Sequence, residues 1–206
     1  MRTLIVLGTG SNAGLISDLV SDIGTHRITA FVENIDLERC GKEMYGKPVI
    51  WVDDLSAAKF GQEVINAMPI GMQTQFIDAV ANHGFEYSKL IHPSAIISNS
   101  TRIDHGVTIL AGSIVGPYTH IGAHSFINRG VIIGHDVDIG PRCVLNPGSN
   151  IAGACRIGEE VLIGMGALVR DHMEIGAHAR VGMGAVVTRN VATNTIVYGN
   201  RARARN

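Results

Sequence analysis

A strict repeat of six residues runs through the second half of the chain and constrains its fold more than any other feature. An aliphatic residue stands at every sixth position from Ile97 to Val187, and glycine directly follows eight of these sixteen residues. A period of six matches neither the helical period of 3.6 residues nor the strand period of two. It matches a triangular prism, in which each hexad forms one flat face and one corner and three hexads make an 18-residue coil. The sixteen residues are Ile97, Ile103, Ile109, Val115, Ile121, Ile127, Ile133, Ile139, Leu145, Ile151, Ile157, Ile163, Val169, Ile175, Val181 and Val187.

Small side chains accompany this repeat. Two positions before each aliphatic residue except Ile175 stands a small or modest side chain, such as Ala95, Ser113 or Ala185. We expect the aliphatic residue to point inward and the small one to fit the tight corner, so that stacked coils bury a continuous column of Ile and Val. The sequence therefore predicts a left-handed parallel β-helix of the hexapeptide-repeat type over residues 91–206, with a short C-terminal tail.

Residues 1–90 follow a different pattern, in which short apolar runs alternate with helical patterns. Strands that alternate with helices predict a small parallel sheet with helices on its faces. About 90 residues supply only half of a dinucleotide-binding fold, so we expect an α/β half-Rossmann domain. The expected strands or extended segments are Thr3–Leu7, Ile28–Val32, Pro48–Val52 and Val64–Met68, and the expected helices are Leu15–Ile23, Asp54–Phe60 and Met72–Asn82.

A glycine loop joins the first expected strand to the first expected helix, and it contains Gly8, Gly10 and Gly14. Glycine lets a backbone approach a phosphate closely, and a helix N-terminus favours negative charge. We therefore expect this domain to bind the nucleotide part of a substrate, and a mononucleotide group fits half of the fold better than NAD does. The alternative is a tight turn that only closes the strand on the helix.

Five residues are the predicted nucleotide contacts. Gly10, Ser11 and Asn12 stand at the start of the helix, where phosphates would lie. Glu33 and Asn34 follow the second strand, where an acidic side chain can meet a ribose hydroxyl. We expect these two residues to lie near the ribose or the base.

Composition and charge exclude several classes of protein. The formal net charge is −1, which gives no reason to expect a nucleic acid partner. No apolar run is long enough to span a membrane, and the apolar start at Thr3–Leu7 is too short for a signal peptide, so we expect a cytoplasmic protein without a membrane span. The basic tail holds Arg201, Arg203 and Arg205, and it is either a solvated terminus or a phosphate contact.

Cysteine and histidine spacing gives no sign of a disulfide or a metal site. Cys143 and Cys155 both stand at corner positions but are separated by two hexads instead of three, so they belong to different edges of the prism. With Cys40 they make an odd number of cysteines, as is usual in a reducing compartment. No set of His, Cys and Asp recurs at the three-hexad spacing that would stack ligands, so no metal is expected.

The stretch from Asn128 to Gly140 reads Asn-Arg-Gly-Val-Ile-Ile-Gly-His-Asp-Val-Asp-Ile-Gly. Together with the glycine-loop domain, the Ile-His-Pro-Ser-Ala joint at 91–95 and the uninterrupted coils, it resembles the sialic-acid O-acetyltransferase type of left-handed β-helix sugar acyltransferase. That family includes N-acetyltransferases of nucleotide-linked 4-amino-4,6-dideoxy sugars, of the kind that make bacillosamine and perosamine. The resemblance covers the whole chain and implies acetyl-CoA as co-substrate, with a role in surface polysaccharide biosynthesis.

The resemblance implies that His135 is the general base and that Asp136 is the acidic neighbour that raises its basicity. Imidazole can take the proton that a sugar amine loses as it attacks a thioester carbonyl near neutral pH, and a carboxylate stabilises the imidazolium and fixes the tautomer. Gly153 lies three hexads after His135, hence one coil away. In the family the residue at this place offers its backbone N–H to the acetyl carbonyl, as an oxyanion donor does.

Further contacts are carried over from the family. Asn128 matches a residue that contacts the sugar, although an asparagine ladder with Asn146 is the structural alternative. Met165 and Met183 occupy places that contact coenzyme A, with plain apolar filling as the alternative. Val144 stands where relatives commonly have a second histidine that touches the acetyl donor, so only a backbone contact could survive there. In the glycine loop, Asn12 replaces a frequent histidine and can still donate a hydrogen bond.

The sequence therefore favours an acetyl-CoA-dependent N-acetyltransferase that acts on the amine of a nucleotide-activated amino-dideoxy sugar. We expect a homotrimer, because flat prism faces pack around a threefold axis and coenzyme A binds in the groove between neighbours. One alternative is an O-acetyltransferase of sialic acid or another sugar hydroxyl. A second is a non-catalytic β-helix that binds or scaffolds, and a third, an NAD-dependent enzyme, lacks a second half-domain.

Overall fold

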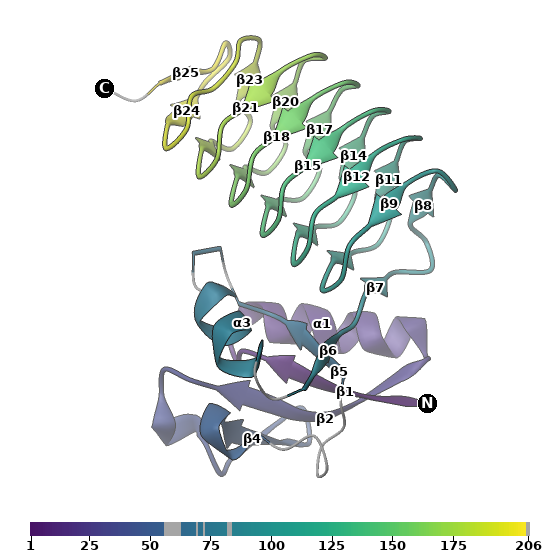
Figure 1. The fold of residues 1–206 in the computed structure, drawn as a ribbon, viewed down its shortest axis with the longest axis vertical. Coiled ribbons are helices and arrows are strands. Elements are labelled where there is room, and N and C mark those ends of the chain that lie inside the picture. The colour runs from purple at the N-terminus through teal and green to yellow at the C-terminus, as the bar shows by residue number, and fades with distance from the viewer. Residues whose placement is uncertain (56–62, 69, 72, 82–83, 205–206) are drawn as a thin grey trace. The chain divides into compact units, whose positions relative to one another are not determined.

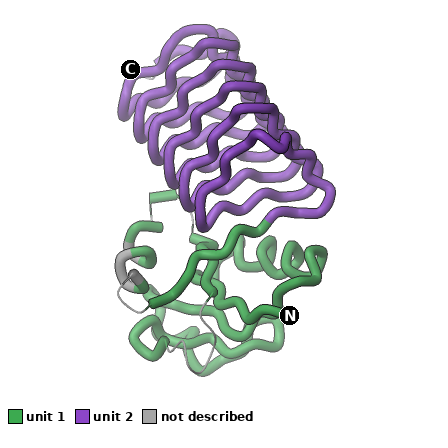
Figure 2. Tube along the Cα trace, turned by 45° about the vertical axis from the view of Figure 1, so that its right-hand side comes forward, with its two compact units in different colours: residues 1–90 green, residues 91–206 purple. Residues whose placement is uncertain are grey.

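The computed structural model describes residues 1–55, 63–68, 70–71, 73–81 and 84–204. The chain divides into two compact units, Met1–Leu90 and Ile91–Asn206 (Figure 2). Unit 1 is an α/β domain and unit 2 is a solenoid of short parallel strands (Figure 1). The predicted combination of an α/β domain with a hexapeptide-repeat β-helix is confirmed.

Unit 1 is built on one sheet with the strand order β3-β4-β2-β1-β5-β6. Its strands pair in parallel except for the β3–β4 hairpin. Its elements are β1 (Arg2–Leu7), α1 (Ser11–Ile23), β2 (His26–Glu33), the 3₁₀ turn η1 (Leu37–Arg39), β3 (Glu43–Met44), β4 (Lys47–Trp51), the 3₁₀ turn η2 (Val52–Asp54), β5 (Glu63–Asn66), α3 (Gln73–Ala81) and β6 (Glu86–Tyr87). All four expected strands occur within a few residues of their predicted bounds, whereas most of the helix expected at Asp54–Phe60 lies outside the described residues.

The core of unit 1 explains why these elements form. Leu4 to Leu7 of β1 are fully buried at the centre of the sheet. Alternate residues of β1 point to opposite faces, and Ile5 packs in one cluster with Phe76 and Val80 of α3. The helix α1 buries one stripe of its side chains and ends at Gly24, whose φ of 68° only glycine adopts readily.

Unit 2 stacks short strands into three sheets, one for each face of the prism, and all strands but β25 pair in parallel (Figure 1). The first sheet contains β7 (Leu90–Ile91), β10 (Thr108–Ile109), β13 (Phe126–Ile127), β16 (Val144–Leu145), β19 (Leu162–Ile163), β22 (Arg180–Val181), β24 (Ile196–Tyr198) and β25 (Arg203–Ala204). The second contains β8 (Ile96–Ile97), β11 (Ile114–Val115), β14 (Ile132–Ile133), β17 (Asn150–Ile151), β20 (Leu168–Val169) and β23 (Val186–Val187). The third contains β9 (Arg102–Ile103), β12 (His120–Ile121), β15 (Asp138–Ile139), β18 (Arg156–Ile157) and β21 (Glu174–Ile175).

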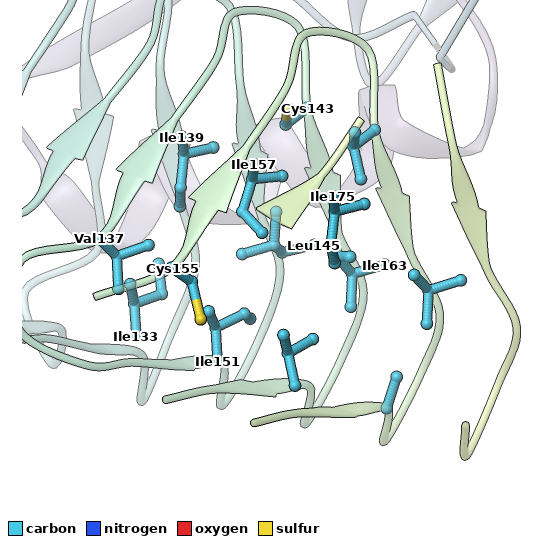
Figure 3. Close-up of a cluster of buried hydrophobic side chains, with 14 of the residues drawn as sticks. Ile133, Val137, Ile139, Cys143, Leu145, Ile151, Cys155, Ile157, Ile163 and Ile175 are labelled. Carbon is cyan, nitrogen blue, oxygen red and sulfur yellow. The ribbon is translucent and has the colours of Figure 1, made fainter. Parts of the chain in front are cut away.

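The aliphatic repeat lines the interior of the solenoid (Figure 3). Ile133 pairs with Ile151, and Ile151 pairs with Val169, so each coil consists of three hexads, as predicted. The small residues at the corners are buried as well, including Cys143 and Cys155. The three cysteines are free, and the thiols of Cys143 and Cys155 donate to different backbone carbonyls.

The two ends of the solenoid depart from the sixteen-hexad pattern. At the start, β7 adds one more strand, because His92 N–H donates to Ile109 O at 2.9 Å and continues the ladder. At the end, Val181 pairs with Val197, so the last coil is shorter than three full hexads. The tail strand β25 then pairs antiparallel with β24, which changes the direction of the chain and ends the stack.

Most of the turns between strands contain one residue in the left-handed conformation. Every sixth residue from Gly106 to Gly184 has φ between 52° and 70°, as the third residue of a type II turn requires. On the edge that follows the first sheet all five are glycine, and we call it the glycine edge: Gly112, Gly130, Gly148, Gly166 and Gly184. The edge that follows the second sheet carries side chains instead, and we call it the Asp136 edge: Tyr118, Asp136, Ala154 and His172. A non-glycine residue there costs about 1–2 kcal/mol.

Replacing Ile139 by Asp is expected to unfold the solenoid, because Ile139 is fully buried and the change buries an unpaired charge. The loss in the free energy of unfolding should exceed about 4 kcal/mol. Ile139→Val is the matched control, since it removes one methylene and should cost only about 0.5–1.5 kcal/mol. Thermal unfolding followed by circular dichroism measures both variants. A cooperative melt of Ile139→Asp near that of the wild type would contradict the inward placement.

Candidate active site

His135 and Asp136 lie together on the turn that follows β14. The Nδ1 atom of His135 is 2.8 Å from Oδ2 of Asp136, and both side chains are more than half exposed. Asp136 has φ of 54°, and its N–H donates to Pro117 O at 2.9 Å. Asp and Asn tolerate this left-handed conformation better than most residues. The turn therefore presents an imidazole to solvent with a carboxylate fixed beside it.

Gly153 lies directly against the His135 ring in the next coil. A Cβ added to Gly153 would be 2.6 Å from Nε2 of His135, so no other residue fits there without moving the ring. The backbone joins the same two coils, since Ala154 N–H donates to His135 O at 2.9 Å. The structure thus brings His135, Asp136 and Gly153 together, as the three-hexad period predicts.

This arrangement defines which nitrogen of His135 can act as a base. When Nδ1 carries the proton it donates to Asp136, and Nε2 keeps a free lone pair on the side of Gly153. In the described part of the chain no backbone acceptor is found for the Gly153 N–H. A proton acceptor and a hydrogen-bond donor are therefore adjacent on an exposed turn.

Several other solenoid histidines have structural partners. His120 lies between two carboxylates, with Nε2 at 2.8 Å from Asp104 and Nδ1 at 2.9 Å from Asp138. Burial, together with the nearby charges of His105 and Arg142, lowers the pKa of His124 to about 4, so its ring is neutral near pH 7. The imidazole of His135 differs from these in being both exposed and held by one carboxylate.

Asn128 lies on a different edge from His135. It follows β13 at the glycine edge, is buried, and its Oδ1 accepts the N–H of Arg129 at 2.9 Å. Asn128 N–H also donates to Leu145 O, which places Asn146 beside it in the next coil. One chain therefore does not bring Asn128 and His135 to the same turn.

The predicted coenzyme A contacts other than Gly153 also lie apart from His135. Met165 and Met183 follow β19 and β22 at the glycine edge, and both side chains are exposed. Their turns stack closely, because a Cβ on Gly164 would be 2.5 Å from Met183 N. Val144 is an outward residue of β16 in the first sheet and is half-buried. His135 and the two methionines thus occupy the two edges of one prism face.

A surface depression of about 610 Å³ borders Asp136. It is hollow because Ala154 stands between Asp136 and His172 in the row of left-handed residues. Arg156 and Glu174 form part of its wall. Sequence reasoning missed this feature, although the three-hexad spacing of Asp136, Ala154 and His172 contains the signal.

The glycine loop of unit 1 has three glycines with three different environments. Gly8 has φ of 112°, and a Cβ there would be 2.7 Å from Met68 Sδ. Gly10 precedes α1 without a side-chain cap, and its Cβ position is open. A Cβ on Gly14 would be 2.8 Å from Tyr45 Oη, so Gly14 serves packing. Gly10 alone leaves the open backbone that a phosphate needs.

Ser11 and Asn12 begin α1 next to Gly10. Ser11 is exposed and Asn12 is half-buried. The first turn of α1 contains no acidic residue, so its N–H groups and the helix dipole favour an anion there. A phosphate could therefore reach Ser11, Asn12 and the free N–H groups at the start of α1.

Glu33 is buried and has its partners within the protein. Thr9 donates its hydroxyl to Oε2, and the N–H groups of Asn34 and Ile35 donate to Oε1 at 2.9 Å. Burial raises the pKa of the Glu33 carboxyl, but these hydrogen bonds lower it, and the net shift is downward. Glu33 therefore holds the glycine loop to the loop after β2, and Asn34 lies in that loop.

A depression of about 200 Å³ opens between these two loops. Its wall includes Thr9, Ile35, Asp36, Arg39 and Met68. Sequence reasoning missed Arg39, because η1 folds its side chain back to Thr9, far earlier in the chain, and no local pattern indicates this.

Among the described residues, no group of three or more His, Cys, Asp or Glu side chains could hold a metal ion. No helix in the described part of the chain has the length and apolar character needed to cross a membrane.

The comparisons with known proteins agree on the fold. The bacterial transferase hexapeptide (six repeats) family matches residues 94–129, 118–153 and 154–189. No curated protein matches the chain in sequence. Among solved structures, PerB from Caulobacter crescentus in complex with CoA and GDP-perosamine is 29% identical, with a TM-score of 0.90 over 100% of this chain and 98% of that chain.

Two further structures are similar over the full length. The acetyltransferase domain of PglB from Neisseria gonorrhoeae FA1090 is 28% identical, with a TM-score of 0.89 over 100% of both chains. WeeI from Acinetobacter baumannii AYE is 22% identical with a TM-score of 0.88 over 100% of both chains, and it supports the fold alone. Residues 94–189 match the hexapeptide-repeat model, and the whole chain is similar to left-handed β-helix sugar acyltransferases of known structure.

Proposed function

We propose that this protein is an acetyl-CoA-dependent N-acetyltransferase that acts on the amino group of a nucleotide-activated amino-dideoxy sugar. The observation that carries the proposal is the His135–Asp136 pair lying against Gly153. The similar structures include a perosamine N-acetyltransferase bound to CoA and GDP-perosamine and a PglB domain bound to acetyl coenzyme A. Such an enzyme would act in the cytoplasm, in the synthesis of surface polysaccharide.

The chemistry follows from the two nitrogen atoms of His135. The sugar amine attacks the thioester carbonyl carbon, forming a C–N bond, while Nε2 takes the proton that the amine loses. The Gly153 N–H stabilises the oxyanion of the tetrahedral intermediate. The C–S bond then breaks, and the proton on Nε2 passes to the departing thiolate to give coenzyme A. Asp136 stabilises the imidazolium between these two steps.

The separation of the two edges supports assembly into a trimer. His135 lies on the Asp136 edge, whereas Met165 and Met183 lie on the glycine edge, at the other side of the face formed by β8, β11, β14, β17, β20 and β23. That face presents an exposed apolar row, interrupted by Asn150 of β17: Ile96, Ile114, Ile132 and Leu168. Packing three such faces about an axis places the glycine edge of one chain beside the Asp136 edge of the next. Acetyl-CoA would then lie between two chains.

Sedimentation velocity should show a trimer at micromolar concentration. Ile132→Asp should shift the protein toward monomer, because it places a charge in the apolar row. Ile196→Asp is the matched control, since Ile196 has similar exposure but belongs to another sheet. A wild-type protein that stays monomeric would contradict the shared-groove arrangement.

His135→Ala should lower kcat by about 10²- to 10⁴-fold, the usual effect of removing a general base. Steady-state kinetics with a nucleotide-linked amino sugar measures this, and calorimetry checks that acetyl-CoA still binds. His178→Ala is the control, because His178 is a half-buried histidine on another edge of the solenoid, where it pairs with carboxylates. Near-normal turnover by His135→Ala would mean that the amine arrives already deprotonated.

Asp136→Asn should lower kcat by less than His135→Ala does. Asn is compatible with the left-handed backbone and can keep a hydrogen bond to Nδ1, but it no longer stabilises the imidazolium. The same kinetic assay compares the two variants. A larger loss for Asp136→Asn than for His135→Ala would assign the proton transfer to the carboxylate.

Unit 1 would hold the nucleotide, with phosphates at Gly10, Ser11 and Asn12. Glu33→Ala should raise the KM for the nucleotide sugar and leave that for acetyl-CoA nearly unchanged, because Glu33 organises the loops around the depression. Glu63→Ala is the matched control: its carboxylate also has internal partners, Ser88 and His26, but it lies at the other end of the sheet. If Glu33→Ala and the wild type have equal KM values for the nucleotide sugar, unit 1 has a structural role and does not bind the nucleotide.

One assay separates this function from O-acetylation. Thiol release from acetyl-CoA is measured against UDP-, GDP- and dTDP-linked amino sugars and against sialic acids. The proposed function requires release with an amino sugar nucleotide. Release with sialic acid alone would identify a hydroxyl acceptor instead.

A further inference from the structure

Arg39 stands at the mouth of the 200 Å³ depression of unit 1, with about half of its side chain exposed. Two nitrogen atoms of its guanidinium contact three side chains. Nη1 donates to Thr9 Oγ1 at 3.0 Å and lies 3.6 Å from Glu33 Oε2, while Nε lies 3.2 Å from Asp36 Oδ2. A long side chain on the surface is thus held in one orientation, which reduces the entropy that a ligand contact would cost.

The contacts of Arg39 determine which part of it a ligand can use. A guanidinium donates hydrogen bonds only in its plane, and the Nη1 and Nε side of that edge already faces Thr9, Glu33 and Asp36. The flat face remains, and guanidinium faces stack on aromatic rings. The exposed part of Arg39 therefore suits a planar ring.

The charge around Arg39 also distinguishes a ring from a phosphate. Two carboxylates, Glu33 and Asp36, surround one guanidinium, which leaves the group with a formal charge of −1. That charge disfavours a diphosphate at this place. The start of α1, with no acidic residue in its first turn, suits the diphosphate better.

Apolar side chains complete the slot. Ile35 is 57% exposed, and both Ile35 and Met68 line the depression. Aliphatic and thioether groups pack well against aromatic faces. Arg39, Ile35 and Met68 together form a wall for a flat, uncharged ring.

We propose that Arg39 is the platform on which the nucleobase of the substrate stacks. This inference rests on the proposed nucleotide-sugar specificity and assigns one residue to base recognition within it. Glu33 and Asp36 are the positioning residues that hold the guanidinium plane.

The test measures the Kd of UDP, GDP and dTDP by calorimetry, without acetyl-CoA or turnover. Arg39→Lys keeps the positive charge and removes the plane, and it should weaken the diphosphate that binds best to the wild type by roughly 10-fold. Arg39→Gln keeps a planar head without the charge and should bind more tightly than Arg39→Lys. Arg2→Lys is the matched control, because Arg2 also pairs with a carboxylate, at the other end of β1. Melting temperatures check that each variant is folded.

The outcomes are distinct. Arg39→Lys binding as tightly as wild type, or more tightly than Arg39→Gln, would identify a phosphate contact and overturn the platform. A wild-type protein that binds none of the three diphosphates would overturn the nucleotide-sugar function itself, and the platform with it. Tight wild-type binding with the order wild type, Gln, Lys supports both.

Discussion

The close approach of consecutive coils at their turns is the constraint on which the rest of unit 2 depends. A Cβ on Gly116 would lie 2.6 Å from the backbone of Gly134, and one on Gly134 would lie 2.7 Å from Gly153 N. Where the next coil passes this closely the turn has no room for a side chain, and the strands pair residues that are three hexads apart. The same closeness places Gly153 against the His135 ring. The close approach of consecutive coils thus explains both the glycines in the turns and the contact between Gly153 and His135.

The left-handed turn position is glycine on one edge of the solenoid and carries mostly side chains on the other two edges. Glycine is the residue that this conformation favours, and the glycine edge has it at all five positions. Tyr118, Asp136 and His172 hold the same conformation on the neighbouring edge at a cost in stability. Strained residues of this kind point to function when a chemical role is available to them. Asp136 has such a role, because its carboxylate orients the imidazole of His135.

The six-residue period made the solenoid, and the proximity of His135, Asp136 and Gly153 within it, predictable from sequence. The conformation of the loops of unit 1 was not predictable in this way. A fixed spacing identifies coil neighbours, so the position of Gly153 beside His135 follows by counting. Counting fails at the end of the stack, where the last coil is shorter than three hexads. In unit 1, Glu33 follows the pattern of a ribose-binding acid, yet its carboxylate is buried against Thr9 and the next loop. Arg39 shows no motif, because its position depends on long-range contacts that are visible only once the fold is known.

The proposed trimer depends on the apolar prism face that lies between the Asp136 edge and the glycine edge. A single chain has His135 on one edge and the exposed Met165 and Met183 on the other, with the apolar row between them. Burying that row between copies stabilises the assembly, and the same contact joins the two kinds of edge. In the proposed trimer, the hydrophobic contact between copies would also complete the groove for acetyl-CoA. Stability and activity would then depend on one surface, so a change in the apolar row should affect both.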